Sequence, residues 1–303
     1  MLKTKKIGQQ FTIDIPKQWE TRTIESLFKD HWKAPKKLVH ELRMDKSVLV
    51  NGQEANWTSP LHLGDTLSIP FFKPEVSTVQ PTYLDIAILY EDDHLLIANK
   101  PAGIDTHPNS EEDDHSLLNG VAFHLQSKGE LYYIKHIHRL DRDTTGAVIF
   151  AKHRMAGAIL DRLLEERKIK RTYMALVEGK LKNSSGTISD PIGRDRHHPT
   201  RRRVSPTGQT AVTHYNVHVY EAKKDTSLIS CQLDTGRTHQ IRVHLSSIGH
   251  PLIGDILYGS SVKLSRQALH AYKVEFTHPF TEEKILCKAP FTDSPSIFPD
   301  INI

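Results

Sequence analysis

The chain has 303 residues, of which 38% are hydrophobic and 25% carry a charged side chain. That length permits one large domain with a smaller one beside it, and the composition is that of a soluble globular protein. No run approaches the roughly 20 apolar residues needed to span a bilayer, and the first residues lack the apolar core of a secretory signal. We therefore expect a cytoplasmic protein without membrane attachment.

Cysteine content and charge say little about function by themselves. Cys231 and Cys287 lie in apolar, strand-like settings without metal-ligand spacing, which favours buried free thiols. The net charge of +4 is modest, but basic residues cluster in 167–171 and 193–203. Such clusters are either solvated surfaces or contacts for a polyanion, and both interpretations stay open.

The first recognisable elements form a small unit. Apolar residues recur at intervals of three and four in 23–32 and again in 36–46, which predicts two short helices. A strand-like run then leads into Asn51-Gly52, a strong hairpin signal, and another turn and strand follow at 61–70. The sequence thus predicts a compact module over residues 11–72.

A linker and a larger domain are expected after the module. Residues 73–83 contain prolines and small polar residues and predict a flexible linker, which leaves 84–291 as the main domain and 292–303 as a tail. Strands outnumber helices in the main domain, so we predict an α+β fold with a mixed, mostly antiparallel sheet, flanking helices and a central cleft. Strands are expected within 85–103, 171–179, 211–221, 227–235 and 268–279, and helices within 116–129, 155–170 and 239–251.

A highly charged run, HRLDRDTTG (138–146), lies between two apolar runs that predict strands. A surface turn would explain its polarity and the final Gly146. A carboxylate at the mouth of a buried sheet is costly to desolvate, however, so Asp141 is a candidate nucleophile, base, metal ligand or turn cap. Spacing leaves hydrolysis by Asp141 with Asp143 open. The 19 histidines show no metal-site spacing, and we expect no metal.

This run resembles the H-R-L-D-x-x-T-S-G signature of the RluA-type RNA pseudouridine synthases, with Thr145 in place of the usual serine. The resemblance spans nearly all of residues 85–290. It implies the pseudouridine synthase fold and the isomerisation of uridine in RNA to pseudouridine without cofactor or metal. Four further segments agree in the same order: LLIANKPAGIDTHP (95–108), KIKRTYMALVEG (168–179), LDTGRTHQIRVHLSSIGHPLIGDILYG (233–259) and LHAYKVEFTHP (269–279).

The resemblance also implies roles for particular side chains. Asp141 would be the catalytic carboxylate, Arg139 would fill the gap left by the flipped base, and Tyr173 would stack against that base. Arg242 would pair with Asp141, and Leu269 would form an apolar wall of the pocket. From the residues alone, Tyr173 could equally be core, and Arg242 could be a solvent-facing helix residue.

RNA is the partner that the remaining patterns indicate. Residues 19–70 resemble the S4-type RNA-binding domain through VLVNG and GDTLSI, although a solvated helix face also explains the basic residues there. The segment 193–203 is expected to form a loop that grips RNA beside the pocket. The RNA-binding residues predicted in these two places are Lys36, Lys37, Arg43, Arg201, Arg202 and Arg203.

The sequence leaves the target and two other functions open. We favour ribosomal RNA as the substrate, with transfer RNA as the alternative, and no obligate protein partner is evident. A non-catalytic RNA-binding paralogue would have kept the fold without the chemistry. A glycosidase or nucleoside hydrolase would instead release free uracil.

Overall fold

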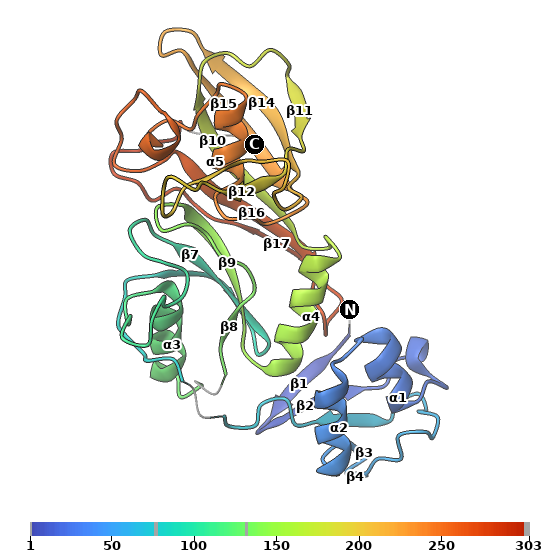
Figure 1. Ribbon diagram of the computed structural model, residues 1–303. Coiled ribbons are helices and arrows are strands. Elements are labelled where there is room, and N and C mark those ends of the chain that lie inside the picture. Colours follow the sequence, from blue (N-terminus) through green and yellow to red (C-terminus); the bar gives the residue numbers. More distant parts are fainter. Residues whose placement is uncertain (1, 76–77, 131–132, 300–303) are drawn as a thin grey trace.

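The computed structural model describes residues 2–75, 78–130 and 133–299, and within them it contains three sheets. A five-stranded sheet lies in the N-terminal part, a ten-stranded sheet forms the centre of the remainder, and a two-stranded hairpin stands apart. Helices pack beside the sheets, so the fold is α+β, as the strand-rich sequence predicted. Figure 1 shows an elongated molecule whose N-terminal module (blue) lies at one end.

The N-terminal module is a small antiparallel sheet with short helices beside it. Its strands follow the order β1-β2-β5-β3-β4, and every neighbouring pair is antiparallel. Asn51 and Gly52 both take positive φ between β3 and β4, which suits the Asn-Gly turn that the sequence predicted. The elements are β1 (Thr4–Ile7), β2 (Gln10–Asp14), η1 (Lys17–Trp19), α1 (Ile24–Ser26), the π-helical turn η2 (Leu27–His31), α2 (Lys36–Met44), β3 (Leu49–Val50), β4 (Gln53–Glu54) and β5 (Thr66–Ile69).

The central sheet of the main domain has the order β11-β14-β15-β10-β16-β9-β7-β6, with β17 beside β16 and β8 beside β9. Its paired strands are antiparallel except for β16 and β9. The strands are β6 (Ala87–Glu91), β7 (Leu95–Lys100), β8 (Lys135–His136), β9 (Thr145–Ala151), β10 (Lys170–Glu178), β11 (Ser185–Ile188), β14 (Thr213–Glu221), β15 (Thr226–Leu233), β16 (Leu269–Thr277) and β17 (Lys284–Lys288).

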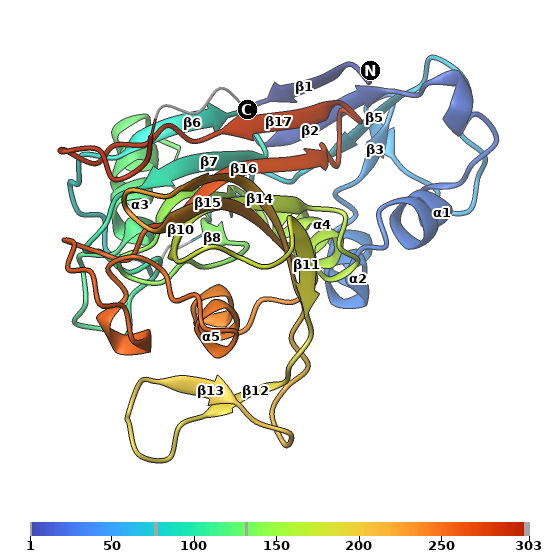
Figure 2. The same cartoon turned by 90° about the horizontal axis from the view of Figure 1, so that it is seen from above.

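Helices cover this sheet, and a hairpin projects from it. The helices are α3 (Leu117–Ser127), α4 (Arg154–Glu165), α5 (Gln240–Ser247) and the 3-10 turn η3 (Ile256–Tyr258). The hairpin consists of β12 (Ile192–Arg194) and β13 (Arg202–Val204), and Figure 2 shows it extending away from the sheet near α5. Among the described residues, no helix has the length and apolar character that crossing a membrane requires.

The short parallel contact between β9 and β16 fixes where the charged run ends. His270 lies opposite Thr145, and Ala271 lies opposite Gly146. Gly146 has a φ of 113°, and a Cβ there would collide with the backbone of Ala271. Glycine is therefore needed for a close approach of two strands rather than for a surface turn. This contact sets the register of the segment that carries Asp141.

Aromatic and histidine side chains join the module to the main domain in one continuous core. Phe71 of the module stacks on His153, with ring centres 5.0 Å apart. Phe280 stacks on His94 at 4.3 Å and also contacts Phe11 at 5.5 Å. The module is therefore packed against the main domain, and the linker expected at 73–83 stays a prediction.

The segment predicted as a linker is itself partly held in place. The side-chain amide of Asn119 donates a hydrogen bond to the carbonyl of Gln80 at 2.7 Å, and the backbone N–H of Thr82 donates to the carbonyl of Asn119 at 3.2 Å. Residues 76 and 77 of that segment lie outside the described residues. The proposed boundaries at 72, 83 and 291 remain predictions about how the chain divides.

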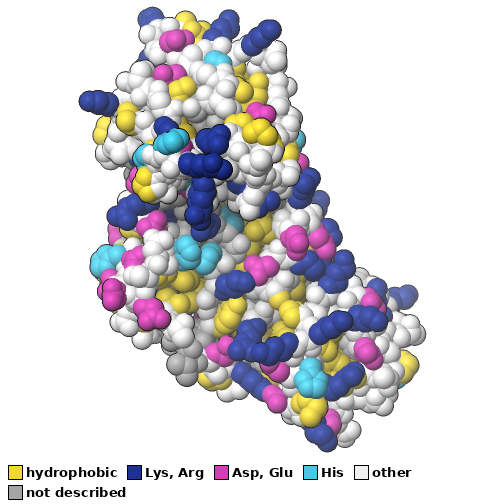
Figure 3. Space-filling model, viewed as in Figure 1, with side chains coloured by type: hydrophobic (Ala, Val, Ile, Leu, Met, Phe, Trp, Pro, Cys, Tyr) yellow, Lys and Arg dark blue, Asp and Glu magenta, His cyan; other side chains and the backbone are white. Residues whose placement is uncertain are grey.

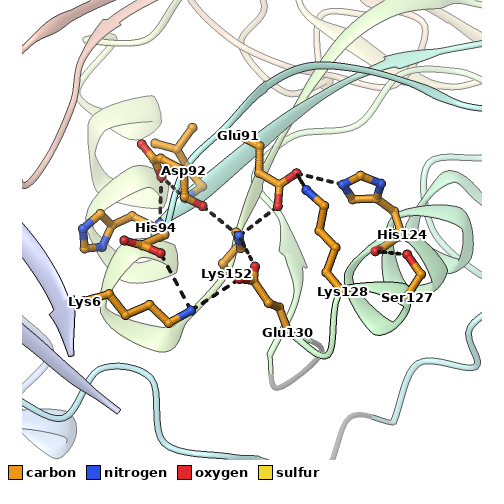
Figure 4. Close-up of polar contacts among 11 residues, drawn as sticks. Lys6, Glu91, Asp92, His94, His124, Ser127, Lys128, Glu130 and Lys152 are labelled. Atoms are coloured by element: carbon orange, nitrogen blue, oxygen red, sulfur yellow. Dashed lines mark hydrogen bonds and ion pairs between the residues drawn. The ribbon is translucent and has the colours of Figure 1, made fainter. Parts of the chain in front are cut away.

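A buried lysine organises the polar edge of the same interface (Figure 4). The Lys152 ammonium donates to Glu91 at 3.0 Å, to Glu130 at 2.9 Å and to the carbonyl of Asp92 at 2.8 Å. Lys6 of β1 pairs with Glu130 at 3.6 Å, which ties the module to this network. Burial raises the pKa of Glu91, but hydrogen bonds from Lys128, His124 and Lys152 outweigh burial and lower that pKa to about 2.

We expect Phe280→Ala to lower the free energy of unfolding by about 3–5 kcal/mol, the usual cost of truncating a buried phenylalanine. Phe280 is 1% exposed and touches rings from both parts of the chain. Urea unfolding of the two proteins would measure the difference. The control is Leu286→Ala, since Leu286 is 58% exposed and should change stability by less than about 1 kcal/mol. Equal stability of the two variants would contradict a packed interface.

Candidate active site

A cleft of about 540 Å³ opens between the charged run and the start of α5. Segments from five places in the chain line it: 137–144, the end of α4 with the turn after it (161–167), the start of β10, residues 233–242 and the first residue of β16. The five residues that the sequence singled out for chemistry all lie on this lining: Arg139, Asp141, Tyr173, Arg242 and Leu269.

Hydrogen bonds from two buried side chains, Thr106 and Lys100, fix the backbone of the loop that carries Asp141. The Thr106 hydroxyl accepts the backbone N–H of Leu140 and donates to its carbonyl, both at 3.0 Å. Lys100 is fully buried, and its ammonium donates to the carbonyl of Arg142 at 2.6 Å. Burial lowers the pKa of Lys100 to about 8, although nearby aspartates oppose the shift. These bonds satisfy buried backbone groups and leave the Asp141 carboxylate, which is 25% exposed, facing the cleft.

Arg242 forms a double clamp between two carboxylates. Its Nη1 donates to Asp141 Oδ2 at 3.1 Å. Its Nε and Nη2 donate to the two oxygens of Asp255 at 2.7 Å and 2.9 Å. Burial lowers the pKa of Arg242, but the two carboxylates outweigh burial and raise that pKa above its ordinary value. The fork geometry orients the guanidinium, and the guanidinium in turn orients Asp141.

Tyr173 and Leu269 supply the less polar part of the cleft. Tyr173 lies on β10 and Leu269 on β16, and each is 4% exposed. Burial raises the pKa of Tyr173, so its phenol stays neutral near pH 7. Arg139 lies at the rim, is exposed, and donates to the Thr238 hydroxyl at 3.5 Å.

The arginine-rich segment forms the β12–β13 hairpin instead of the loop that the sequence predicted, although 195–201 still connects the strands as a loop. Arg201 and Arg203 are both exposed, and Arg201 pairs with Asp195 at 2.7 Å. Arg202 lines an adjoining cavity of about 380 Å³ that also reaches Asp141. Figure 3 shows the molecule from the same side as Figure 1, with Lys and Arg side chains gathered near the middle of that face and others over the module.

The basic residues predicted on the module lie on α2 (Figure 1) and are not among the residues that line the cleft. Lys36 and Lys37 are exposed at the start of that helix. Arg43 lies over the ring of Trp57 at 4.8 Å and pairs with Glu25 at 3.6 Å. Arg43 is therefore engaged within the protein, whereas Lys36 and Lys37 form no ion pair or ring contact within the described part of the chain.

Three residues of the site were not singled out from the sequence: Asp255, His239 and Tyr258. Asp255 is 2% exposed and binds Arg242, as described above. His239 precedes α5 in a left-handed conformation, and its Nε2 lies 3.9 Å from Asp141 Oδ2. All three belong to the segment 233–259 that carried part of the family resemblance, so that segment was their only sequence signal.

The geometry defines what the site can do chemically. An aspartate held by a guanidinium, in a cleft with a tyrosine and a leucine, can act as a nucleophile or a base toward a planar ligand. Asp143 lines the adjoining cavity but not the main cleft, which weakens a paired-carboxylate arrangement with Asp141. Within 2–75, 78–130 and 133–299, no group of three or more His, Cys, Asp or Glu residues could hold a metal ion.

Comparisons with known proteins show the family to which the chain is related. Residues 94–247 match the family model described as RNA pseudouridylate synthase, and residues 11–67 match the model of the RluD ribosomal pseudouridine synthase N-terminal domain. The chain is 50% identical over 285 residues to the uncharacterized RNA pseudouridine synthase YhcT of Bacillus subtilis. This match covers 94% of each of the two chains.

Two further similarities extend this result. The chain is 35% identical over 258 residues to ribosomal large subunit pseudouridine synthase D of Xanthomonas campestris, covering 80% of this chain and 77% of that protein. Among solved structures, human RNA pseudouridylate synthase domain containing 1 matches with a TM-score of 0.57 and 26% identity, covering 73% of this chain and 89% of that one.

Proposed function

The chain belongs to the RNA pseudouridylate synthases, isomerases that act on RNA, and we propose that it converts specific uridines of large-subunit ribosomal RNA to pseudouridine through Asp141. The observation that carries this proposal is the Arg242 clamp, which holds the Asp141 carboxylate at the cleft between Tyr173 and the rim. Such a carboxylate needs neither metal nor cofactor to attack carbon.

The proposed reaction begins when the target uridine leaves its stack and enters the cleft, because its glycosidic bond is otherwise out of reach. Asp141 then attacks the nucleotide and the bond between N1 of the base and C1′ of the ribose breaks. The base turns, C5 bonds to C1′ while the bond to the Asp141 oxygen breaks and frees the carboxylate, C5 loses its proton and N1 gains one. Tyr173 stacks on the base, Leu269 supports it, and Arg139 occupies the gap left in the RNA.

The identity of the RNA substrate is inferred from the related proteins and not from the geometry of the cleft. A relative named for the ribosomal large subunit covers most of the chain, and this favours ribosomal RNA over transfer RNA. We infer that the enzyme works in the cytoplasm, where its RNA is made. Mapping pseudouridines in large-subunit ribosomal RNA and in transfer RNA, with and without the gene, tests the target. Gene-dependent pseudouridines confined to transfer RNA would contradict the ribosomal assignment.

The reaction itself is tested with purified protein and RNA labelled with tritium at C5 of uridine. An isomerase releases tritium while the base stays attached to the RNA, whereas a hydrolase releases free uracil. Chromatography of the small-molecule fraction separates the two outcomes. RNA binding with neither product would favour the non-catalytic paralogue.

We propose that the β12–β13 hairpin binds RNA phosphates beside the cleft, and that Lys36, Lys37 and Arg43 bind more distant ones. The triple variant Arg201→Ala, Arg202→Ala and Arg203→Ala is expected to weaken RNA binding. The slope of log affinity against log salt should flatten by up to about 0.9 for each phosphate that the variant no longer neutralises. Arg201 should contribute least, because its ion pair with Asp195 competes with phosphate.

A matched control removes the same charge elsewhere. Lys182, Lys223 and Lys224 are exposed near the other end of β10 and β14, away from the cleft. Replacing these three with alanine should leave the salt slope nearly unchanged. Filter binding from low to moderate salt measures both variants, and equal slopes would reduce the arginine cluster to an ordinary solvated surface.

A further inference from the structure

His239 lies beside the reacting carboxylate in a conformation that needs support. Its φ is 58° and its ψ is 21°, in the left-handed region that a histidine adopts only at a cost. The side chain is 14% exposed and lines the cleft, with Nε2 3.9 Å from Asp141 Oδ2. That separation is too long for a hydrogen bond, so Asp141 does not occupy this nitrogen.

Tyr258 fixes the other side of the imidazole. The Tyr258 hydroxyl and His239 Nδ1 are 2.8 Å apart, and the same hydroxyl oxygen accepts the backbone N–H of Arg202 at 2.9 Å. Within the described residues, these two groups are the partners of the hydroxyl, and because the Arg202 N–H is a donor, His239 Nδ1 is the acceptor available to the hydroxyl hydrogen. The hydroxyl therefore donates to Nδ1, and a neutral imidazole must carry its own hydrogen on Nε2, which faces the cleft.

The protonation state is consistent with this arrangement. Burial lowers the pKa of His239, although the nearby Asp141 opposes the shift, so the ring is neutral at pH 7. Tyr258 is 9% exposed, and its ring also lies 5.0 Å from the Arg242 guanidinium. One tyrosine thus contacts the arginine hairpin, the Asp141 clamp and His239.

We propose that His239 contacts the substrate by donating its Nε2–H to an oxygen of the target nucleotide, and that Tyr258 is a positioning residue that selects this tautomer. The inference rests on the proposed function, because it assumes a uridine in the cleft. The acceptor is a base carbonyl or an oxygen of the ribose and phosphate. The hairpin that binds RNA also completes this wall of the site, since the Arg202 N–H holds Tyr258.

The test uses two variants of the full-length protein under single-turnover conditions at saturating RNA. Tyr258→Phe keeps the ring beside Arg242 and removes only the hydroxyl, and His239→Asn keeps a residue that tolerates left-handed backbone. Each is expected to lower the rate about tenfold while RNA affinity stays within about twofold. The double variant should be no slower than the slower single variant, because both remove the same interaction.

A control and a substrate series complete the experiment. Tyr220→Phe removes an exposed hydroxyl that donates to Asp225 at 2.8 Å, and it should react at the wild-type rate. A 2-thio or 4-thio target uridine weakens one base acceptor. An analogue that slows the wild type but not His239→Asn identifies that base oxygen, whereas equal sensitivity of both proteins assigns the acceptor to the ribose and phosphate. A wild-type rate in His239→Asn, or multiplying losses in the double variant, would overturn the proposal.

A readout independent of turnover separates this inference from the proposed function. Nitrogen-15 NMR of the imidazole should show hydrogen on Nε2 at neutral pH in the wild type and a mixture of tautomers in Tyr258→Phe. Hydrogen on Nδ1 in the wild type would overturn the inference even if the enzyme makes pseudouridine. An inactive wild type with hydrogen on Nε2 would instead contradict the proposed function and leave the tautomer assignment standing.

Discussion

Asp141→Asn should abolish pseudouridine formation, with a loss in rate of at least about 10⁴-fold, while RNA affinity stays close to that of the wild type. The amide keeps the shape of the carboxylate, and its oxygen can still accept the hydrogen bond from Arg242 Nη1. It cannot act as a nucleophile, because it carries no negative charge. Tritium release from RNA labelled at C5 of uridine measures the rate.

Asp143→Asn is the matched control for this prediction. Asp143 is two residues away and faces the adjoining cavity, so its loss should slow the reaction far less, within about tenfold. Near-normal turnover in Asp141→Asn would remove Asp141 from the chemistry. Equal, large losses in both variants together with free uracil as the product would favour a hydrolase that uses both carboxylates.

The charged run shows how far local sequence could lead. A carboxylate between two buried strands is costly to desolvate, so few roles can explain its presence there. The five ordered segments of the resemblance indicated one protein family, and the comparisons confirm that family. The role of Gly146 could not be predicted from the sequence. A glycine after polar residues predicts a turn, whereas here the approach of β16 requires it, and only the three-dimensional pairing shows that.

Residues that act through long-range contacts were beyond local patterns. Asp255 lies 13 residues after Arg242, and nothing in that spacing indicates that two nitrogens of the guanidinium meet its carboxylate. The loop from α5 through η3 brings them together. Tyr258 in the same loop resembles an ordinary apolar residue in a turn, yet its hydroxyl is hydrogen-bonded to His239, which lies before α5.

The fold was predictable where hydrophobic periodicity was strong and uncertain where strands were short or polar. Helix α3 was expected within 116–129 and occupies Leu117–Ser127, with the buried face that its spacing predicted. β1 reads TKKI, and β12 and β13 carry arginines, so none has a hydrophobic alternation long enough to signal a strand. The run 133–137 similarly forms only the two-residue β8.

The interface between module and main domain needed the structure most. Phe71 and Phe72 lie just before a proline-containing polar segment, which the sequence presents as the end of a strand and the start of a linker. Their rings instead pack on His153 and His94, which come from separate parts of the main domain. Composition can indicate a flexible segment, but it cannot reveal that the elements on either side share a core.

Arg242→Ala should lower the single-turnover rate by at least about 100-fold, because it removes the guanidinium that orients Asp141. It should also destabilise the protein by about 3–5 kcal/mol, because Asp255 is left as a buried carboxylate without its partner. Arg242→Lys keeps the charge but not the planar fork, so it should recover only part of the rate. Tritium release and urea unfolding measure the two effects.

The double variant Arg242→Met with Asp255→Ala separates catalysis from stability. Removing both charges leaves no unpaired buried ion, so the free energy of unfolding should recover most of what Arg242→Ala loses. The rate should not recover, because no group then directs the Asp141 carboxylate into the cleft. If the double variant regained wild-type turnover along with its stability, the clamp would serve folding alone. A fully active Arg242→Ala would likewise exclude any role for the guanidinium in positioning Asp141.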